Sequence, residues 1–438
     1  MAGNQIRKAL ASMAKRSYVA HRMAGTQIRS VAIVGGGPVG SALAIYLARA
    51  GLRVAMFQRG KRPFILVGES LVPAIVPFLR KFGVEEEVAA YSIYKPGATF
   101  TFTPELLRSF RFAEVRGCHT KYAYNVPRAD FDATLLRRAV ESGAYLFEGS
   151  AVLEKTAASD QVQLSEATLA ATAGVLDGQP DFIVDAGGRT RLIARLLGIR
   201  SIAGTRRDTA LHAHMEGVPL ISEGNVHSDR IERGWSWRIP LPGRTSVGLV
   251  VPSDHLKNFG ENAEDQFDRL LRSDPNTGVW APNAKRVTPV VKYTNYQLRS
   301  TRGVGPNWAL VGDAFGFVDP VFSSGLLIGM QSAEVLASAI LDGSPQAFTR
   351  YEQKILRTLA IWQRVVEYYY DGRLFTLFQV GEYVRRTFIG KLTNRHMESH
   401  LPRIFTGEAA TSRYNSALLN FMIKYALAGN DPCEFEVR

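Results

Sequence analysis

The sequence predicts an α/β fold that begins with a nucleotide-binding β–α–β unit. Residues 30–34 form a short apolar run, the following segment repeats apolar side chains at helical spacing, and residues 53–58 form a second apolar run. Between the first run and the helix, Gly35, Gly37 and Gly40 have the spacing G-x-G-x-x-G. Directly after a strand and at the start of a helix, this spacing is typical of turns that bind the pyrophosphate of a dinucleotide.

Each residue of this turn has a physical role. Gly35 allows the tight turn, Gly37 lets the backbone approach the pyrophosphate, and Gly40 lets the helix pack on the strand. The helix begins at Pro38, where free N–H groups and the positive end of the helix dipole favour an anion. Gln58 closes the second strand, where an acid normally holds the ribose, and its amide can still bond a ribose hydroxyl.

The pattern of the remaining chain predicts further strands and helices. We expect a turn and helix over residues 67–83, a strand over 94–103, an amphipathic helix over 127–144, a strand from 145, and a strand, Gly-Gly turn and helix over 181–198. Strand-like alternation fills residues 205–300, and a strand, a loop and a long helix cover 307–341. From Pro345 onward the pattern is helical.

These elements predict three regions. Residues 1–29 form a basic tail that we expect to be disordered, residues 30–345 form the nucleotide-binding domain, and residues 346–438 form a helical region. A sheet lobe for the substrate is built mainly from residues 90–125 and 205–300.

The tail carries six basic residues and no acid, a composition that would also suit an organelle transit peptide. The sequence MAGNQIRK at the start is nearly repeated as MAGTQIRS from Met23, so a chain that starts at Met23 and a basic arm both stay open.

Composition excludes several other classes of protein. With 438 residues, 46% hydrophobic and 21% charged, the chain is typical of a globular protein with a large core. The longest apolar segment, residues 323–341, is interrupted by Gln331 and Glu334, so we expect no membrane-spanning helix. The two cysteines form no metal or disulfide pattern, which favours the cytoplasm. His212 and His214 share a strand face but lack a neighbouring carboxylate, so we expect no metal site.

The net charge of +13 lacks the motif structure of a nucleic-acid reader, so we expect no nucleic-acid partner. A basic face can steer an acidic partner instead.

Two later motifs narrow the function. GWSWRIP matches the pattern W-x-W-x-I-P, and FVDPVFSSG matches F-x-x-P-x-x-S-x-G. Together with the glycine-rich turn, they resemble the flavin-dependent halogenases, most closely the branch that acts on phenols and pyrroles, within the wider superfamily of FAD monooxygenases. The matching residues are Trp235, Trp237, Ile239 and Pro240 in the first motif and Phe317, Pro320, Ser323 and Gly325 in the second.

This resemblance implies a fold and a cofactor. The fold would be an FAD-binding, Rossmann-like domain of the hydroxybenzoate-hydroxylase type, with an inserted β-sheet substrate lobe and a helical C-terminal region. LVGDAFG resembles the second FAD motif, in which Gly312 and Asp313 would meet the cofactor. Arg128 matches the arginine that lies near the flavin, and VGES, with Glu69 and Ser70, resembles the loop along the isoalloxazine ring.

The resemblance also implies the chemistry. Reduced FAD and O2 would oxidise chloride or bromide to hypohalous acid, which halogenates an electron-rich aromatic substrate. The N–H groups of Ser324 and Gly325, beside Pro320, would contact the halide, since a turn before a helix makes an anion-binding concavity. Trp235 and Trp237 would line the path of the hypohalous acid.

A lysine would deliver the halogen, but this chain has Pro77 where the tryptophan halogenases carry it. Lys95 is the first candidate and Lys81 the second, and Glu69 is also counted among the catalytic candidates. Phe322 replaces the acid that precedes the serines of the tryptophan halogenases, so free tryptophan is not the expected substrate.

Several alternatives stay open at this point. The same fold serves FAD-dependent aromatic hydroxylases, flavin reductases of isoprenoid chains and inactive flavin-binding partner proteins. The segment 185–195 lacks the serine of the D-G-x-x-S-x-x-R motif of self-sufficient monooxygenases, which favours FADH2 supplied by a separate NAD(P)H flavin reductase. The aromatic substrate would be either free or tethered to an acyl or peptidyl carrier protein, for which Arg385, Arg386 and Lys391 are the expected docking residues.

Overall fold

The computed structural model describes residues 27–60, 65–103, 105–157, 160–294, 296–384, 402–407, 413–426 and 432–437. Residues 1–26 of the basic tail, and Arg385, Arg386 and Lys391, lie outside these ranges.

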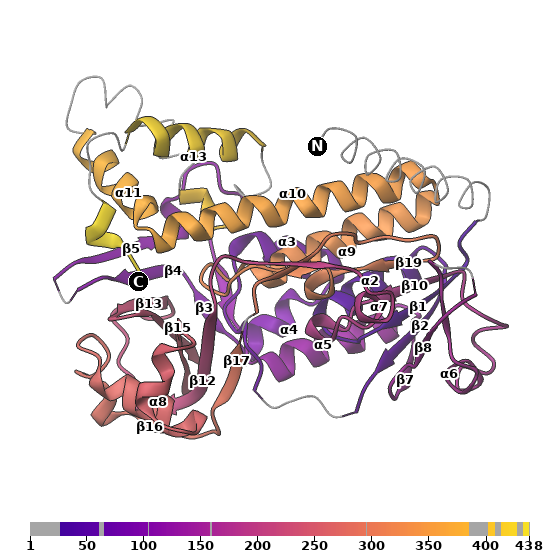
Figure 1. The fold of residues 1–438 in the computed structure, drawn as a ribbon, viewed down its shortest axis with the longest axis horizontal. Helices are drawn as coiled ribbons and strands as arrows, with labels where there is room; N and C mark the ends of the chain where they lie inside the picture. Colours follow the sequence, from indigo (N-terminus) through magenta and orange to yellow (C-terminus); the bar gives the residue numbers. More distant parts are fainter. Residues whose placement is uncertain are drawn as a thin grey trace, which may run out of the picture.

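A five-stranded parallel sheet forms the centre of the nucleotide-binding domain (Figure 1). Its strand order is β19 (Trp308–Leu310), β10 (Phe182–Asp185), β1 (Ser30–Val34), β2 (Arg53–Gln58) and β7 (Tyr145–Glu148). The apolar runs of β1 and β2 are buried because helices cover the sheet, as parallel sheets require. Helix α2 (Pro38–Arg49) packs against α5 (Arg128–Glu141) and α9 (Ser324–Asp342).

A larger mixed sheet forms the substrate lobe. It runs β16 (Lys285–Arg286), β12 (Asp208–Glu216), β15 (Arg244–Pro252), β14 (Gly234–Leu241), β13 (Val226–Ile231), β4 (Gly97–Thr101) and β5 (Leu107–Arg111), and β17 (Val291–Thr294) also pairs with β12. Side chains alternate between its two faces. Leu211 and Ala213 pack into a second core under α8 (Ala263–Ser273), whereas Ala210, Trp235 and Trp237 belong to the main core.

The helical C-terminal region lies along the top of both sheets in the view of Figure 1. Its long helix α10 (Pro345–Tyr370) packs on α9 and is followed by α11 (Arg373–Val384) and α13 (Arg413–Ala426). Ser344 caps α10 by accepting a hydrogen bond from the N–H of Ala347. Because α10 is 26 residues long, it carries Tyr369 and Tyr370 from the parallel sheet to the substrate lobe.

The sequence predicted one strand over residues 94–103, but the structure has two strands there. Pro96 separates β3 (Ile93–Lys95), which pairs with β6 (Ala123–Asn125), from β4 of the large sheet. Proline has no N–H to donate to a ladder, so a break at this position follows from its chemistry. The remaining elements are β8 (Leu153–Lys155), β9 (Val162–Leu164), β11 (Ser201–Ala203), β18 (Leu298–Ser300), β20 (Gly316–Phe317), α3 (Val76–Phe82), α4 (Glu85–Ala90), α6 (Glu166–Ala170) and α7 (Leu192–Leu196).

Among the described residues, α9 is the one helix that is long and apolar enough to cross a membrane. Most of it is buried inside the protein, where it contacts α2 and α10. These contacts account for its apolar character as that of a core helix.

Candidate active site

A single cavity of about 680 Å³ runs between the parallel sheet and the substrate lobe. Residues from every motif of the sequence analysis meet on its wall. The predicted site residues that line it are Gly35, Gly37, Pro38, Gln58, Ser70, Arg128, Trp235, Trp237, Asp313, Pro320 and Gly325.

The glycine-rich turn forms one end of the cavity. Gly35 has a φ of 116°, and a Cβ there would lie 2.4 Å from the carbonyl oxygen of Ala186. A Cβ on Gly40 would lie 1.9 Å from the carbonyl oxygen of Gly35, so both glycines are needed for packing. A Cβ on Gly37, by contrast, would meet no atom within 4 Å. The turn therefore leaves open space for a ligand at Gly37, beside the start of α2.

Gln58, the expected ribose contact, lies beside this turn and lines the cavity. Its Oε1 accepts a hydrogen bond of 3.0 Å from the N–H of Gly36. Gln58 therefore also holds the turn in place, a role that the sequence did not indicate.

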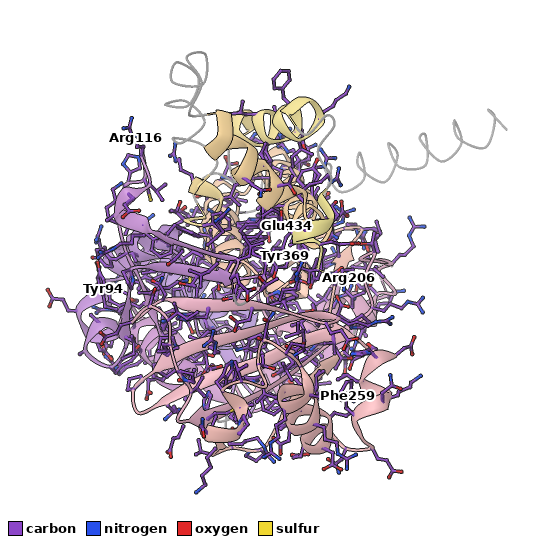
Figure 2. The ribbon with its side chains drawn as sticks, turned by 90° about the vertical axis from the view of Figure 1, so that its left-hand side faces the viewer. Tyr94, Arg116, Arg206, Phe259, Tyr369 and Glu434 are labelled. Carbon is purple, nitrogen blue, oxygen red and sulfur yellow. The ribbon has the colours of Figure 1, made fainter. Side chains whose placement is uncertain are left out.

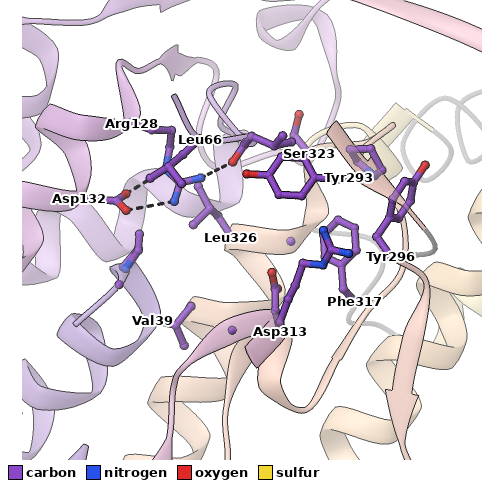
Figure 3. A pocket seen from close by; sticks show the side chains of 18 of the residues that line it. Val39, Leu66, Arg128, Asp132, Tyr293, Tyr296, Asp313, Phe317, Ser323 and Leu326 are labelled. Carbon is purple, nitrogen blue, oxygen red and sulfur yellow. Dashed lines mark hydrogen bonds and ion pairs between the residues drawn. The ribbon is translucent and has the colours of Figure 1, made fainter. Parts of the chain in front are cut away.

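Two charged side chains, Arg128 and Asp313, line the cavity and are labelled in Figure 3. Arg128, in the first turn of α5, pairs with Asp132 at 2.9 Å and donates to the carbonyl oxygen of Val67. Asp313 is half-buried on the cavity wall, where desolvation raises its pKa to about 6 even though Arg128 and Arg189 lower it. Gly312, just before it, has a φ of 61° and packs against Val39.

The loop that carries Glu69 is anchored to the substrate lobe. Glu69 Oε1 lies 2.8 Å from Nε2 of His214, and Oε2 lies 3.8 Å from Nε2 of His212. All three side chains are buried. Burial alone would raise the pKa of Glu69, but its interactions with the two histidines lower it to about 2. The sequence showed no carboxylate near the histidines because Glu69 is more than 140 positions away.

These three side chains are the only group of three or more His, Cys, Asp and Glu residues, within the described ranges, whose ligand atoms lie within 4.8 Å of one another. Two ligands of a tetrahedral zinc ion, each about 2.1 Å from the metal, lie about 3.4 Å apart. The Glu69–His214 separation of 2.8 Å is instead that of a hydrogen bond. Nδ1 of His212 also lacks an acceptor among the described residues, whereas metal-bound histidines normally have one. The geometry favours an anchor over a metal site.

The two candidate lysines lie in different environments. Lys95, at the end of β3, is buried and donates to Ser70 Oγ and to the carbonyl oxygen of Leu71, both at 2.8 Å. Burial lowers its pKa from 10.5 to about 7. Lys81 has an exposed side chain that pairs with Glu334 at 2.7 Å. Lys95 therefore reaches the wall of the cavity through Ser70, and Lys81 lies on the outer surface.

Trp235 and Trp237 form the wall on the side of the substrate lobe. Their ring centroids lie 5.7 Å apart on β14. Each indole N–H has a partner: Trp235 donates to the hydroxyl of Tyr370 at 2.9 Å and Trp237 to Ser246 at 3.2 Å. Gly248 leaves room for Trp237, because a Cβ there would lie 2.1 Å from its ring. Both rings are thus fixed in position.

The predicted halide turn lines the same cavity as the tryptophans. Ser323 has a φ of 53° and a ψ of 29°, a conformation that non-glycine residues adopt rarely and mostly at functional positions. α9 begins at the next residue, so the N–H groups of Ser324 and Gly325 are in its unpaired first turn. Ser323, Gly325 and Pro320 line the cavity, whereas the side chain of Ser324 is buried behind it.

The sequence analysis missed two residues that the structure places at this wall. Asp319 lies inside the motif FVDPVFSSG and is fully buried. Tyr370 ends the aromatic run of α10 and contacts both Asp319 and Trp235. The available signal was a single acid within an otherwise apolar motif.

Comparison with known proteins agrees with this site. The family model of the tryptophan halogenases matches residues 30–110 and 107–374. A 1H-pyrrole-2-carbonyl-[peptidyl-carrier protein] chlorinase of Pseudomonas fluorescens is 30% identical over 383 residues, which cover 80% of this chain and 85% of the relative. A flavin-dependent halogenase of Armillaria mellea, armH3, is 30% identical over 71% of this chain and 67% of its own length.

Solved structures show the same fold. The myxobacterial chondrochloren halogenase CndH superposes with a TM-score of 0.70 and 27% identity, covering 93% of this chain and 99% of that one. The flavin-dependent brominase Bmp2 superposes with a TM-score of 0.74 and 23% identity, covering 91% and 98%. The chain therefore belongs to the tryptophan halogenase family and is a flavin-dependent halogenase rather than an aromatic hydroxylase of the same fold.

Proposed function

We propose that this enzyme uses FADH2 and O2 to oxidise chloride or bromide to hypohalous acid, and that it halogenates a pyrrole or a phenol. One observation carries the proposal: the dinucleotide turn, the tryptophan pair and the left-handed turn at Ser323 line the same cavity. A nucleotide cofactor and an anion would therefore share one enclosed space with the path to the substrate.

The cavity fits FAD. The pyrophosphate would lie on the open backbone at Gly37, with Gln58 beside the adenosine ribose. Asp313 would accept a hydrogen bond from a hydroxyl of the ribitol or ribose, and Arg128 would face the flavin together with Gly68 and Ser70. When bound, reduced FAD would supply two of the four electrons that reduce O2, and the halide would supply the other two and so be oxidised. The residues of the chain would hold the halide, exclude water and direct the product.

Three groups would act on the halogen. The N–H groups of Ser324 and Gly325 would hold the halide ion, supported by the positive end of α9. Trp235 and Trp237 would line the path of hypohalous acid and keep the organic substrate away from the flavin. Lys95 would accept or hydrogen-bond the halogen, because burial keeps part of its amine neutral near pH 7.

The substrate and partners follow from the relatives. The Pseudomonas relative is named for a pyrrole on a peptidyl carrier protein, so a carrier-tethered pyrrole is the first substrate to test, with free phenols second. A separate NAD(P)H flavin reductase would supply FADH2 in the cytoplasm, because the chain lacks the D-G-x-x-S-x-x-R motif.

Product analysis tests the proposal directly. Purified protein with FAD, NADH, a flavin reductase, air and bromide should give a monobrominated product from at least one pyrrole or phenol in a panel that includes carrier-tethered acids. Mass spectrometry separates the bromine isotope doublet from the single added oxygen of hydroxylation. Hydroxylated product only, or NADH oxidation by the protein without reductase, would contradict the proposal.

Gly37→Val should remove FAD binding from a protein that still folds. The new side chain meets open space in the free protein but fills the place of the pyrophosphate. Retained flavin absorbance is the measurement, and circular dichroism checks the fold. Gly40→Val is the contrasting variant, because its side chain would clash with the backbone of Gly35 and unfold the turn itself. Stoichiometric FAD on folded Gly37→Val protein would refute this part of the site.

Gly325→Pro should reduce bromination by about 10²–10³-fold, the usual cost of removing one N–H donor from an anion site. Flavin affinity should stay within about twofold, as measured by flavin fluorescence. Gly325→Ala is the matched control, because it keeps the N–H and adds the same Cβ near Phe317. Equal loss in both variants would assign the effect to the contact with Phe317 and not to halide binding.

Lys95→Met should lower product formation by at least about 10²-fold, while flavin oxidation by O2 continues and releases hydrogen peroxide. Methionine keeps the length and the burial of the side chain without the amine. Lys81→Met is the control on the outer surface and should keep wild-type turnover. The ranking of the two lysines would be reversed by full activity of Lys95→Met together with an inactive Lys81→Met.

A further inference from the structure

A chain of buried polar groups links the two motifs that define the site. Tyr370, at the end of α10, donates a hydrogen bond of 3.2 Å to Oδ2 of Asp319 and accepts one of 2.9 Å from the indole N–H of Trp235. Asp319 Oδ2 also accepts a bond of 3.1 Å from Nε2 of Gln297, and its Oδ1 accepts one of 3.0 Å from the N–H of Val321. The carboxylate is thus held between the halide turn and the tryptophan wall.

This chain lies between two cavities. Tyr296 lines the main cavity, and its buried hydroxyl interacts with Tyr370. Tyr370 and Gln297 line a second cavity of about 290 Å³, together with exposed Thr205 and half-buried residues such as Glu367. Figure 2 labels Arg206, another residue of this cavity, and Tyr369, with which it interacts electrostatically. Asp319 is therefore reached from outside through Tyr370 and Gln297, without passing through the main cavity.

We propose that Asp319 and Tyr370 relay a proton from this second cavity, through Tyr296, to the active cavity. The need for a proton at the active cavity rests on the proposed function. Oxidation of a halide consumes one proton: reduced FAD, O2, halide ion and one H⁺ give oxidised FAD, hypohalous acid and one water. The halide loses two electrons, FADH2 loses two, and O2 gains four, so the proton is needed to complete the water. A cavity filled by FAD and an aromatic ring has little room for bulk water to provide it.

The surroundings of Asp319 suit a proton donor. It faces Tyr370 and Tyr369 on α10, Tyr296 before β18, and Asp208 with Arg206 at the start of β12. Burial raises the pKa of this carboxyl to about 7, the bonds from Val321 and Gln297 lower it, and Asp208 raises it. Arg206 pairs with Asp208 at 2.6 Å and stacks 3.8 Å above the ring of Tyr370, so its positive charge interacts with both groups. A carboxyl with this pKa is protonated at pH 6 and ionised at pH 8.

The chain can move a proton in one direction without breaking the fold. When protonated, Asp319 donates to the Tyr370 hydroxyl, which is then able to turn its own hydrogen toward Tyr296. Tyr296, which lines the main cavity, then passes the proton to that cavity, a step for which its buried hydroxyl must turn toward the cavity. Re-protonation of Asp319 comes from the second cavity. Asp319, Tyr370 and Tyr296 act here by positioning and passing a proton, whereas Trp235 fixes the orientation of Tyr370.

The test is the pH dependence of single-turnover bromination, with chemically reduced FAD mixed with protein, bromide, substrate and air. The wild-type rate should fall about tenfold per pH unit above pH 7, as Asp319 loses its proton. Asp319→Asn keeps the shape but cannot donate the proton, so its rate should be independent of pH in this range. The wild-type to variant ratio should thus fall from at least about 10²-fold at pH 5.5 to near one at pH 9.

Tyr370→Phe provides the second variant and Tyr368→Phe the matched control. Tyr370→Phe keeps the ring beneath Arg206 but interrupts the chain of hydrogen bonds. The variant should therefore lose the fall in bromination rate above pH 7 and the solvent deuterium isotope effect that the wild type shows. Tyr368 lies on the same helix, but its hydroxyl bonds Asn420 at 2.8 Å, outside the chain, and its removal should leave the profile unchanged.

Two outcomes separate the relay from the function on which it rests. If Asp319→Asn and Tyr370→Phe lower the rate equally at every pH and keep the wild-type limb, the residues only hold the halide turn in place and the relay is wrong. If wild-type protein binds FAD but brominates nothing at any pH, the proposed function fails instead.

Discussion

The hydrogen bond between Glu69 and His214 joins the two halves of this enzyme. Glu69 belongs to the loop that follows the second strand of the nucleotide-binding unit, and His214 belongs to strand β12 of the substrate lobe. Because both groups are buried, their bond is charge-assisted and shielded from water, and loss of either partner would leave the other unsatisfied. The loop it anchors carries Gly68 and Ser70 to the cavity wall. The contact therefore ties this part of the cavity wall to the substrate lobe.

Burial shifts the pKa values of the ionisable groups around the cavity in opposite directions. Burial lowers the pKa of Lys95 to about 7 and raises that of Asp319 to about 7, because it disfavours the charged form of each. Within the described part of the chain, Lys95 donates hydrogen bonds to Ser70 and to the backbone of Leu71, and no carboxylate is paired with it. Groups that titrate near neutrality behind two walls of one cavity suit chemistry that moves both a proton and an electrophilic halogen.

The aromatic part of the helical region gives the substrate side its rigidity. Tyr369 contacts Trp235 and Phe322 edge to face, with ring centroids 6.4 and 5.5 Å apart. Such contacts fix ring orientation more closely than aliphatic packing does. Helix α10 therefore serves the site although it lies outside the nucleotide-binding domain, since it supplies both packing and the hydroxyl of Tyr370.

The sequence alone determined the nucleotide-binding unit, the family and the motifs that contribute part of the cavity wall. The spacing G-x-G-x-x-G directly after a strand is typical of a turn that binds a dinucleotide. The patterns around Trp235 and Ser323 combine residue types that are rarely found together by chance. These are local signals, carried by neighbours in the chain. The tertiary structure alone decided which distant groups meet. It brought Glu69 to His214, separated Lys95 from Lys81 by burial, and placed Tyr370 between Trp235 and Asp319. Such contacts depend on the relative position of two sheets and a helix, and no local pattern encodes that geometry.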